Sequence, residues 1–406
     1  MRSLLVILCV ALAFTACKKN KSSSAMPQVT DSIVSPAGVT KTNAQRVYVH
    51  YMAWFDDSLT SGTGNWGWHW TMNNQNPSII LSNGRRQIAS WFYPMIGPYA
   101  SSDPDVINYH LMLMKYAGID GIIVDWYGTH NVDDYANIKR NTDSVFNHIA
   151  ASGLQFGICY EDATLPNDKA IAGIDTITAA QQDFTYLKTN YFTSKNYIAI
   201  NNSPLLLCFG PQGMMTTADW QSAFSVFTTS PFFLTLQDHQ SIAGSSANGS
   251  FAWVESTNTT NLQSFYSANN PATSFGAAYP GFKDFYAQGD AGNTLFLIDY
   301  GTTLQNTLTL SQTNNEAYVQ LITWNDYGEG TMIEPTLDYD FTSLQTIQQY
   351  TGVSYTVTEL QLIYKWFTLR KKYMGNASIE AQLAQAYAYL AALNLTQAHA
   401  ILDPLS

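Results

Sequence analysis

AYVQLITWNDYGEGTMIEP, residues 317–335, is the stretch from which the fold can be inferred. Residues 317–322 form a short apolar run with aromatic and β-branched side chains, which predicts a buried strand. Residues 323–335 then predict a tight, glycine-containing loop with two carboxylates, Asp326 and Glu329, three positions apart. In enzymes built on β/α barrels, the chemistry is carried by such loops at the C-terminal ends of the strands.

The spacing of acids and aromatic residues in this loop is typical of one reaction class. Glycoside hydrolysis uses a pair of Asp or Glu residues, one protonating the leaving oxygen and the other acting as base or nucleophile. Trp324 and Tyr327 stand between and beside these acids and offer ring faces on which a sugar can stack. The alternative is a polar loop whose acids only face solvent.

Strand-like runs recur along the chain at the rhythm of a barrel. They are followed in several places by helical patterns, for example at 179–191, and together with 317–322 they make about eight strand–helix units within residues 45–340. We therefore predict an α/β fold, a (β/α)₈ TIM barrel, for the catalytic domain 45–340. The runs before 317–322 are 46–55, 119–127, 154–162, 203–209, 232–236, 251–254 and 294–299.

Helix start signals support two further assignments. Asp103-Pro104-Asp105 predicts the first turn of a helix, with Asp103 as its cap. Thr356-Val357-Thr358-Glu359 is a capping box at the start of a helical segment. Residues 341–406 are therefore expected to form a small C-terminal helical appendage packed on the barrel, to which we assign no chemistry.

The loop of residues 323–335 also resembles a known signature. Trp324-Asn325-Asp326-Tyr327-Gly328-Glu329-Gly330-Thr331-Met332-Ile333-Glu334-Pro335 is similar to the Trp-Asn-Glu-x-x-Glu-Gly-Thr-x-Ile-Glu-Pro motif of glycoside hydrolase family 99, the endo-α-mannosidases. Its first half also resembles family 71, the α-1,3-glucanases. Asp326 stands where family 99 has Glu.

The resemblance implies roles for the two acids. Glu329 is expected to be the general acid and Asp326 the base. In family 99 the equivalent base deprotonates the sugar 2-hydroxyl, which then attacks the anomeric carbon. Because Asp326 is one methylene shorter than Glu, direct activation of water with inversion, closer to family 71, remains an alternative at this point.

The resemblance extends to other strand ends and implies substrate contacts there. Residues 46–55 resemble the His-Tyr-Tyr-x-Trp-Tyr opening of family 99, residues 69–70 its His-Trp pair, and residues 97–127 its Gly-Pro-Tyr-x-Ser-x-Asp-Pro segment and the strand after it. Asp125 replaces the usual Ser of that strand end. The expected substrate-binding residues are Tyr51, Trp54, His69, Trp70, Asp125, Trp126, Glu161, Trp324 and Tyr327.

Charge and motif content argue against several other classes. The net charge of −11 makes a nucleic-acid partner improbable, because phosphate binding requires clustered Lys and Arg. The seven His residues show no metal-binding spacing such as HExxH, so no catalytic metal is expected. The chain contains no GxGxxG or P-loop beside a strand–helix pair, so no cofactor is expected either.

The N-terminus resembles a bacterial lipoprotein signal. Arg2 and the apolar run 4–12 precede Phe14-Thr15-Ala16-Cys17, in which Phe14 stands at the lipobox position usually held by Leu. We expect residues 1–16 to be the signal peptide, Cys17 to carry lipid and residues 17–44 to form a flexible tether. The protein would then be exported and anchored at a Gram-negative outer membrane, on its periplasmic or cell-surface face. An ordinary cleaved signal peptide is the alternative.

Two function classes follow from these observations. The first is a monomeric, endo-acting glycoside hydrolase of α-linked mannans or glucans, with an oligo- or polysaccharide substrate. The second is a catalytically silent glycan-binding lipoprotein on a hydrolase scaffold. The paired acids favour the first, because a binding protein does not need them. Cys159 and Cys208 lie in apolar runs and are expected to be buried thiols, with a disulfide between them as the alternative.

Overall fold

The structure is a computed structural model that describes residues 34–59, 62 and 64–405. The expected signal peptide, the lipobox with Cys17 and the first part of the expected tether lie outside the described residues. The described residues form one compact unit.

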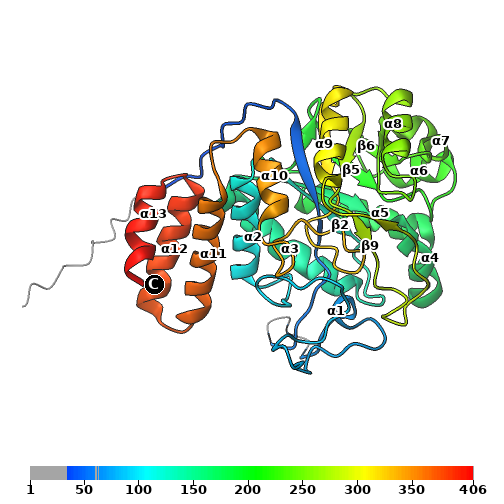
Figure 1. Cartoon of the computed structure of the whole chain (residues 1–406). Helices are drawn as coiled ribbons and strands as arrows, with labels where there is room; N and C mark the ends of the chain where they lie inside the picture. The colour runs from blue at the N-terminus through cyan, green and yellow to red at the C-terminus, as the bar shows by residue number, and fades with distance from the viewer. Residues whose placement is uncertain (1–33, 60–61, 63, 406) are drawn as a thin grey trace, which may run out of the picture. The chain divides into compact units, whose positions relative to one another are not determined.

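Eight parallel strands close into a barrel with helices between them, so the predicted (β/α)₈ fold is confirmed (Figure 1). The barrel closes because β3 pairs directly with β5, while β1 lies in the middle of the sheet between β2 and β11. The barrel strands are β1 (Arg46–Met52), β2 (Gly121–Trp126), β3 (Gln155–Tyr160), β5 (Ser203–Cys208), β6 (Phe232–Leu236), β7 (Gly249–Phe251), β8 (Phe275–Ala278) and β11 (Tyr318–Leu321). Outside the barrel, β4 (Ala199–Ile200) runs antiparallel to β5, and β9 (Phe282–Lys283) pairs with β10 (Leu297–Ile298).

Helices cover the barrel and continue beyond it. The first helices are α1 (Trp68–Thr71), α2 (Pro104–Tyr116), α3 (Tyr135–Ser152), α4 (Leu165–Asn167), α5 (Thr176–Asn190), α6 (Thr217–Phe224) and α7 (Gln240–Ala243). The later ones are α8 (Thr259–Ala268), α9 (Thr303–Thr313), α10 (Thr342–Thr351), α11 (Val357–Lys372), α12 (Ala377–Ala391) and α13 (Leu395–Leu402). Four short turns are η1 (Asp162–Thr164), η2 (Asp168–Ala172), η3 (Gly244–Ser246) and η4 (Asp403–Leu405).

Strand alternation separates the barrel interior from the layer under the helices. Tyr48, Ile123, Cys159, Leu207 and Phe275 belong to one buried cluster contributed by neighbouring strands. The sequence neighbours of the first four on the same strands belong instead to the larger core, which includes the helices. Because successive side chains of a strand point to opposite faces, a residue's position in the strand decides which core it joins.

One predicted barrel strand is wrong. The run 294–299 contains only the short β10, which pairs with β9, and the barrel strand is β8, residues 275–278. Three of its four residues, Gly-Ala-Ala after Phe275, have low strand propensity, so the run is not predicted as a strand from the sequence. Gly276 is needed there, because a Cβ would lie 2.9 Å from the Tyr266 hydroxyl on α8.

The predicted helix starts are confirmed. The Asp103 side chain accepts from the amides of Asp105 and Val106 at the start of α2. Thr356 and Glu359 form the capping box of α11.

The C-terminal helices contact the barrel unit through α2 (Figure 1). Arg370 and Lys371 of α11 form ion pairs with Asp105 and Asp103 at distances of 2.7 Å. The Tyr116 hydroxyl at the end of α2 donates to the Leu390 carbonyl of α12 at 3.0 Å. The appendage is therefore attached at both ends of the same barrel helix.

The residues just before β1, which the sequence assigns to the tether, make specific contacts. The Ala37 amide donates to the Ala391 carbonyl and the Asn43 amide to the Thr351 carbonyl. Lys41 pairs with Asp120. This part of the chain therefore belongs to the folded unit, because its polar groups find partners there.

Two further observations concern the described residues alone. Among them, no helix combines the length and apolar character needed to cross a membrane. Cys159 and Cys208 are both buried and free, as thiols.

Candidate active site

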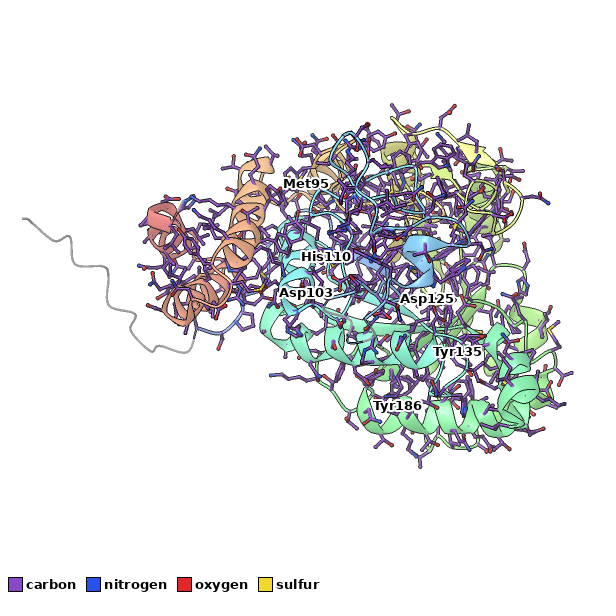
Figure 2. All side chains as sticks on the ribbon, turned by 90° about the horizontal axis from the view of Figure 1, so that it is seen from below. Met95, Asp103, His110, Asp125, Tyr135 and Tyr186 are labelled. Atoms are coloured by element: carbon purple, nitrogen blue, oxygen red, sulfur yellow. The ribbon has the colours of Figure 1, made fainter. Side chains whose placement is uncertain are left out.

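Four carboxylates from three strand ends lie close enough to affect one another's charge. Asp125 is on β2, Glu161 follows β3 directly, and Asp326 and Glu329 lie in the loop after β11. Asp125 and Glu161 hydrogen-bond each other, and the charge of Asp125 also acts on Glu329. By strand alternation the side chains of Asp125 and Glu161 point to the barrel interior. Ile123 and Cys159, which lie two positions before them, belong to the interior cluster. Figure 2 labels Asp125 among the surrounding side chains.

The loop after β11 holds its two acids in different ways. The Asp326 carboxylate accepts a 2.9 Å hydrogen bond from the Glu329 amide, and its own amide donates to the Thr323 hydroxyl at 2.8 Å. The Gly328 amide also bonds the Asp326 carboxylate. Glu329 instead accepts from a phenol, the Tyr286 hydroxyl, at 3.1 Å. The ionised form of Asp326 is therefore stabilised by its own turn.

These environments separate the pKa values of the two acids. Burial, followed by the charge of Asp326, raises the pKa of Glu329 to about 8. Burial also raises the pKa of Asp326, but amide hydrogen bonds and the positive charge of His69 limit it to about 6. At pH 7, Glu329 keeps its proton while Asp326 is mostly ionised. This is the protonation pattern that a general acid and a general base require.

The second pair of acids is shifted in the same direction. Burial raises the pKa of Asp125 to about 7, and burial together with the neighbouring Asp125 raises the pKa of Glu161 well above its usual value. Burial is thus the first cause of the raised pKa in all four acids of the cluster.

Exposure distinguishes the acids that a substrate reaches most easily. Asp125 and Asp326 are each 5% exposed, whereas Glu161 and Glu329 are partly exposed. The two glutamates therefore line the open side of the cluster, and the two aspartates lie deeper.

Two of the aromatic residues predicted to bind substrate do lie beside the acids. The His69 ring stacks on Trp54 with centroids 4.1 Å apart and an interplanar angle of 4°. The charge of His69 acts on Asp326, so this stack borders the cluster. His69 is also paired with Asp134 at 3.5 Å. Trp54 keeps partial exposure, so a sugar ring can reach it.

Five other residues with predicted sugar contacts lie away from the open side. Each is at most 1% exposed: Tyr51, Trp70, Trp126, Trp324 and Tyr327. Tyr51 and Trp126 occupy the strand positions whose side chains face the helices, where Tyr51 meets His110 of α2 and Trp126 packs near Tyr186 of α5. These five rings build the wall behind the acids.

A buried hydrogen-bond network supports the loop from behind. Glu334 accepts from the Tyr99 hydroxyl at 2.7 Å and the Tyr327 hydroxyl at 3.1 Å, and its other oxygen lies 2.9 Å from Nε2 of His110. Asn325 joins this network to β1 through the backbone amide and carbonyl of Met52. Several residues of the signature thus position the loop.

Sequence reasoning missed two residues at the cluster. Tyr286 donates to Glu329, and Tyr127 lies where burial, followed by the charges of Asp125 and Glu161, raises its pKa. Tyr127 follows Asp125 and Trp126 directly, so its position was available as a signal. Tyr286 reaches Glu329 because the Lys283 amide pairs with the Glu329 carbonyl, a contact across the fold without a local pattern.

His50 is a core histidine. It is 1% exposed and its Nε2 lies 2.8 Å from the Gln320 side-chain oxygen across the barrel interior. Burial lowers the pKa of His50 to about 4, so it is neutral near pH 7. It therefore adds no charge to the acid cluster.

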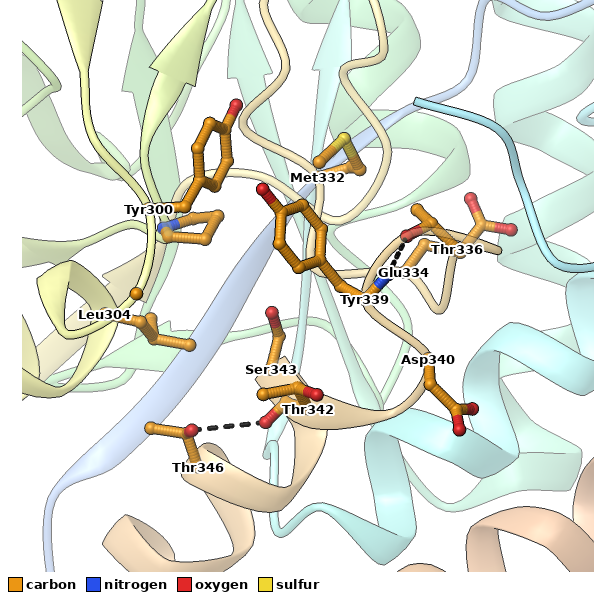
Figure 3. Close-up of a pocket in the computed structure, with 12 residues that line it drawn as sticks. Tyr300, Leu304, Met332, Glu334, Thr336, Tyr339, Asp340, Thr342, Ser343 and Thr346 are labelled. Carbon is orange, nitrogen blue, oxygen red and sulfur yellow. Dashed lines mark hydrogen bonds between the residues drawn. The ribbon is translucent and has the colours of Figure 1, made fainter. Parts of the chain in front are cut away.

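A separate pocket lies beside the end of the same loop (Figure 3). Its lining includes Tyr300, Leu304, Met332 and Tyr339, and it shares Glu334 with the buried network. None of the four clustered carboxylates lines it. The pocket is therefore distinct from the acid cluster.

Comparison with known proteins identifies the family of this chain. The family model described as Glycosyl hydrolase family 99 matches residues 42–367. A mouse protein named glycoprotein endo-alpha-1,2-mannosidase-like protein is 24% identical over 329 residues, which are 71% of this chain and 69% of the mouse protein. The rat glycoprotein endo-alpha-1,2-mannosidase is 32% identical over 88 residues, covering 20% of this chain and 19% of the rat protein.

The fold has a counterpart among solved structures. The GH99 endo-alpha-mannosidase from Bacteroides thetaiotaomicron superposes with a TM-score of 0.58 at 18% identity, covering 79% of this chain and 99% of that one. At that identity the likeness concerns the fold.

Proposed function

Since the chain belongs to glycosyl hydrolase family 99 and is therefore a glycoside hydrolase, we propose that it cleaves internal α-mannosidic bonds with Asp326 and Glu329. The observation that carries the assignment of these acids is their contrasting hydrogen bonding, because Asp326 accepts from the Glu329 amide at 2.9 Å and Glu329 accepts from the Tyr286 hydroxyl at 3.1 Å. Glu329, with a pKa of about 8, retains a proton to give, and Asp326, with a pKa of about 6, is free to accept one.

The choice of mannose rests on two arguments. The mouse and rat relatives carry names of endo-α-1,2-mannosidases. Mannose also suits an attack by its own 2-hydroxyl, because this group is axial and trans to an α leaving group. In glucose the same hydroxyl is equatorial, so the ring would have to distort first.

In the proposed mechanism, Glu329 protonates the glycosidic oxygen while Asp326 takes the proton of the 2-hydroxyl. The freed oxygen attacks the anomeric carbon from the side opposite the leaving group. Glu329, now ionised, takes a proton from the water that opens the resulting three-membered ring, and Asp326 returns its proton to the 2-oxygen. Two inversions give net retention, so the first sugar released should be the α anomer.

Asp125 and Glu161 hold the sugar in this proposal. They are hydrogen-bonded to each other beside the reacting acids, and Glu161 is partly exposed. Trp54 and His69 provide the stacking surface.

Purified protein incubated with α-mannans and α-glucans tests the assignment. We expect release of manno-oligosaccharides, and a fall in kcat of about 10²- to 10⁴-fold in Asp326→Asn and in Glu329→Gln, since each loses one proton-transfer group. Asp238→Asn, an exposed acid, is the matched control and should retain activity.

Other outcomes of this assay assign the chain differently. Release from α-glucans alone would contradict mannose as the sugar. Equal glycan binding by wild type and both variants without any sugar release would mean a glycan-binding protein. A β anomer as first product, seen by proton NMR, would mean that Asp326 activates water directly.

We further propose, from the sequence of residues 1–17, that the protein is exported and lipid-anchored through Cys17. Expression of the full chain in a Gram-negative host should place it in the outer-membrane fraction. Cys17→Ser should lose the lipid, detected by mass spectrometry. Equal membrane association of both forms would contradict the anchor.

A further inference from the structure

Three side chains far apart in the sequence meet outside the acid cluster. His130 lies in the loop after β2, Asp168 at the start of η2 and Asp183 on α5. One potential ligand atom from each lies within 4.8 Å of the other two, and Nε2 of His130 is 3.9 Å from Oδ1 of Asp183. The three groups therefore face a common point.

Asp168 is the unusual member of this group. The residue is 0% exposed, and neither of its carboxylate oxygens has a hydrogen-bond partner among the described residues. Nε2 of His130 is also buried and makes no hydrogen bond within the same described part of the chain, although it faces Asp183 at 3.9 Å. A buried carboxylate without a partner is costly, so these atoms call for a ligand that supplies positive charge.

Asp183 is held in a fixed orientation. Its Oδ1 accepts from the amide and the hydroxyl of Thr129, both at 2.7 Å, and its Oδ2 accepts from the Tyr160 hydroxyl at 2.7 Å. Oδ1 thus uses both of its acceptor sites, whereas Oδ2 keeps one lone pair free to bind an ion. Outer hydrogen bonds of this kind orient metal-binding carboxylates.

The loop after β2 is shaped to approach this carboxylate. Gly128 has a φ of +97°, and a Cβ there would lie 2.6 Å from Oδ2 of Asp183. A side chain at this position would push the loop, and His130 with it, away from Asp183.

Charge balance and donor type restrict the kind of ligand that these three side chains can bind. Two ionised carboxylates with one imidazole keep a net negative charge even when the imidazole is protonated, whereas a divalent cation neutralises them. Calcium and magnesium prefer oxygen ligands alone, and an imidazole with two carboxylates suits zinc. Ligand atoms of a tetrahedral zinc site are roughly 3.3 Å apart for bonds of about 2.0–2.1 Å. Small side-chain movements would therefore bring the three ligand atoms to the separation that zinc requires.

We propose that His130, Asp168 and Asp183 bind one divalent metal ion of the zinc class. The ion ties the loop after Asp125 to the segment after Glu161, and so supports the two strand ends that carry these acids. Its role is structural, since the ligands lie outside the four-carboxylate cluster. The ligands are up to 53 positions apart, from 130 to 183, so no short sequence motif predicts them.

Calorimetric titration with zinc chloride tests the site. The purified protein, without a polyhistidine tag, is first treated with chelator and dialysed. We expect one zinc ion per chain, and a melting temperature several degrees higher with zinc than with EDTA. His130→Gln and Asp168→Asn should each lower the zinc affinity at least tenfold, and Asp238→Asn, an exposed acid, should leave it unchanged.

Melting temperatures of Asp168→Asn separate a metal site from a merely uncompensated charge. In EDTA this variant should melt above wild type, because a buried charge is gone, and in zinc below it, because a ligand is gone. Absence of zinc binding by folded wild type would overturn the proposal. The proposal would also be overturned if Asp168→Asn bound zinc as tightly as wild type, or if this substitution raised the melting temperature equally in EDTA and in zinc.

Discussion

At the scale of single residues, environment decides what each acid does. Asp326 and Glu329 differ by one methylene, yet their pKa values are about 6 and about 8. The difference arises because Asp326 accepts backbone amide hydrogen bonds, while Glu329 accepts one phenol hydrogen bond and faces the charge of Asp326.

This difference predicts a bell-shaped dependence of kcat/KM on pH. Activity should rise as Asp326 ionises, near pH 6, and fall as Glu329 loses its proton, near pH 8. Tyr286 donates to Glu329 and thereby favours its ionised form. Tyr286→Phe should therefore raise the pKa of Glu329 and move the alkaline limb to higher pH, leaving the acid limb in place.

Kinetics from pH 4 to 10 measure both limbs. Tyr339→Phe, which changes a tyrosine 38% exposed, is the matched control and should leave them unmoved. An alkaline limb that moves to lower pH in Tyr286→Phe would contradict the assignment of Glu329 as the acid.

At the scale of elements, the loop after β11 depends on its glycines. Gly330 follows Glu329 directly and has a φ of +72°. A Cβ there would lie 2.7 Å from the Lys283 carbonyl and 2.7 Å from the Tyr300 hydroxyl. The close approach of the 282–286 segment, which brings Tyr286 to Glu329, thus requires glycine at 330.

Gly330→Ala should displace Glu329 and lower kcat/KM by roughly 10²-fold, because small displacements of a catalytic group are costly. Gly84→Ala is the matched control, with a φ of +79° and open space around the new Cβ. Both variants should lose about 1–2 kcal/mol of stability through the left-handed backbone. Only Gly330→Ala should lose activity, measured beside urea unfolding. Equal activity of both would contradict this role of the loop.

At the scale of the whole folded unit, the C-terminal helices stabilise the barrel. Leu390 of α12 is 0% exposed, and its carbonyl accepts from Tyr116 of α2. The family match ends at residue 367, within α11, so α12 and α13 are outside it. We infer that this part acts through packing.

Leu390→Ala should lower the free energy of unfolding by about 2–5 kcal/mol, as expected for a buried leucine, and leave kcat unchanged. Met374→Ala, at a residue 68% exposed, should change stability by about 0.5 kcal/mol or less. Urea unfolding and initial rates measure the two effects. A large loss of kcat in folded Leu390→Ala would assign the helices a role in catalysis.

Local pattern was sufficient for much of this protein. The period of the apolar runs predicts the (β/α)₈ barrel, and the capping residues predict the starts of α2 and α11. The acids of the 323–335 loop and their resemblance to family 99 predict the reaction class. These features are readable from sequence because they depend on residues close together in the chain.

The tertiary structure alone decided which side chains face the acids. Tyr51, Trp126 and Tyr327 have the residue types of sugar-binding sites, but packing places them in the wall behind the cluster. Packing also selects the Gly- and Ala-rich β8 as a barrel strand and brings Tyr286 to Glu329 and His130 to Asp168. The physical reason is that facing, burial and pKa depend on neighbours distant in the sequence, which are assembled only when the barrel closes.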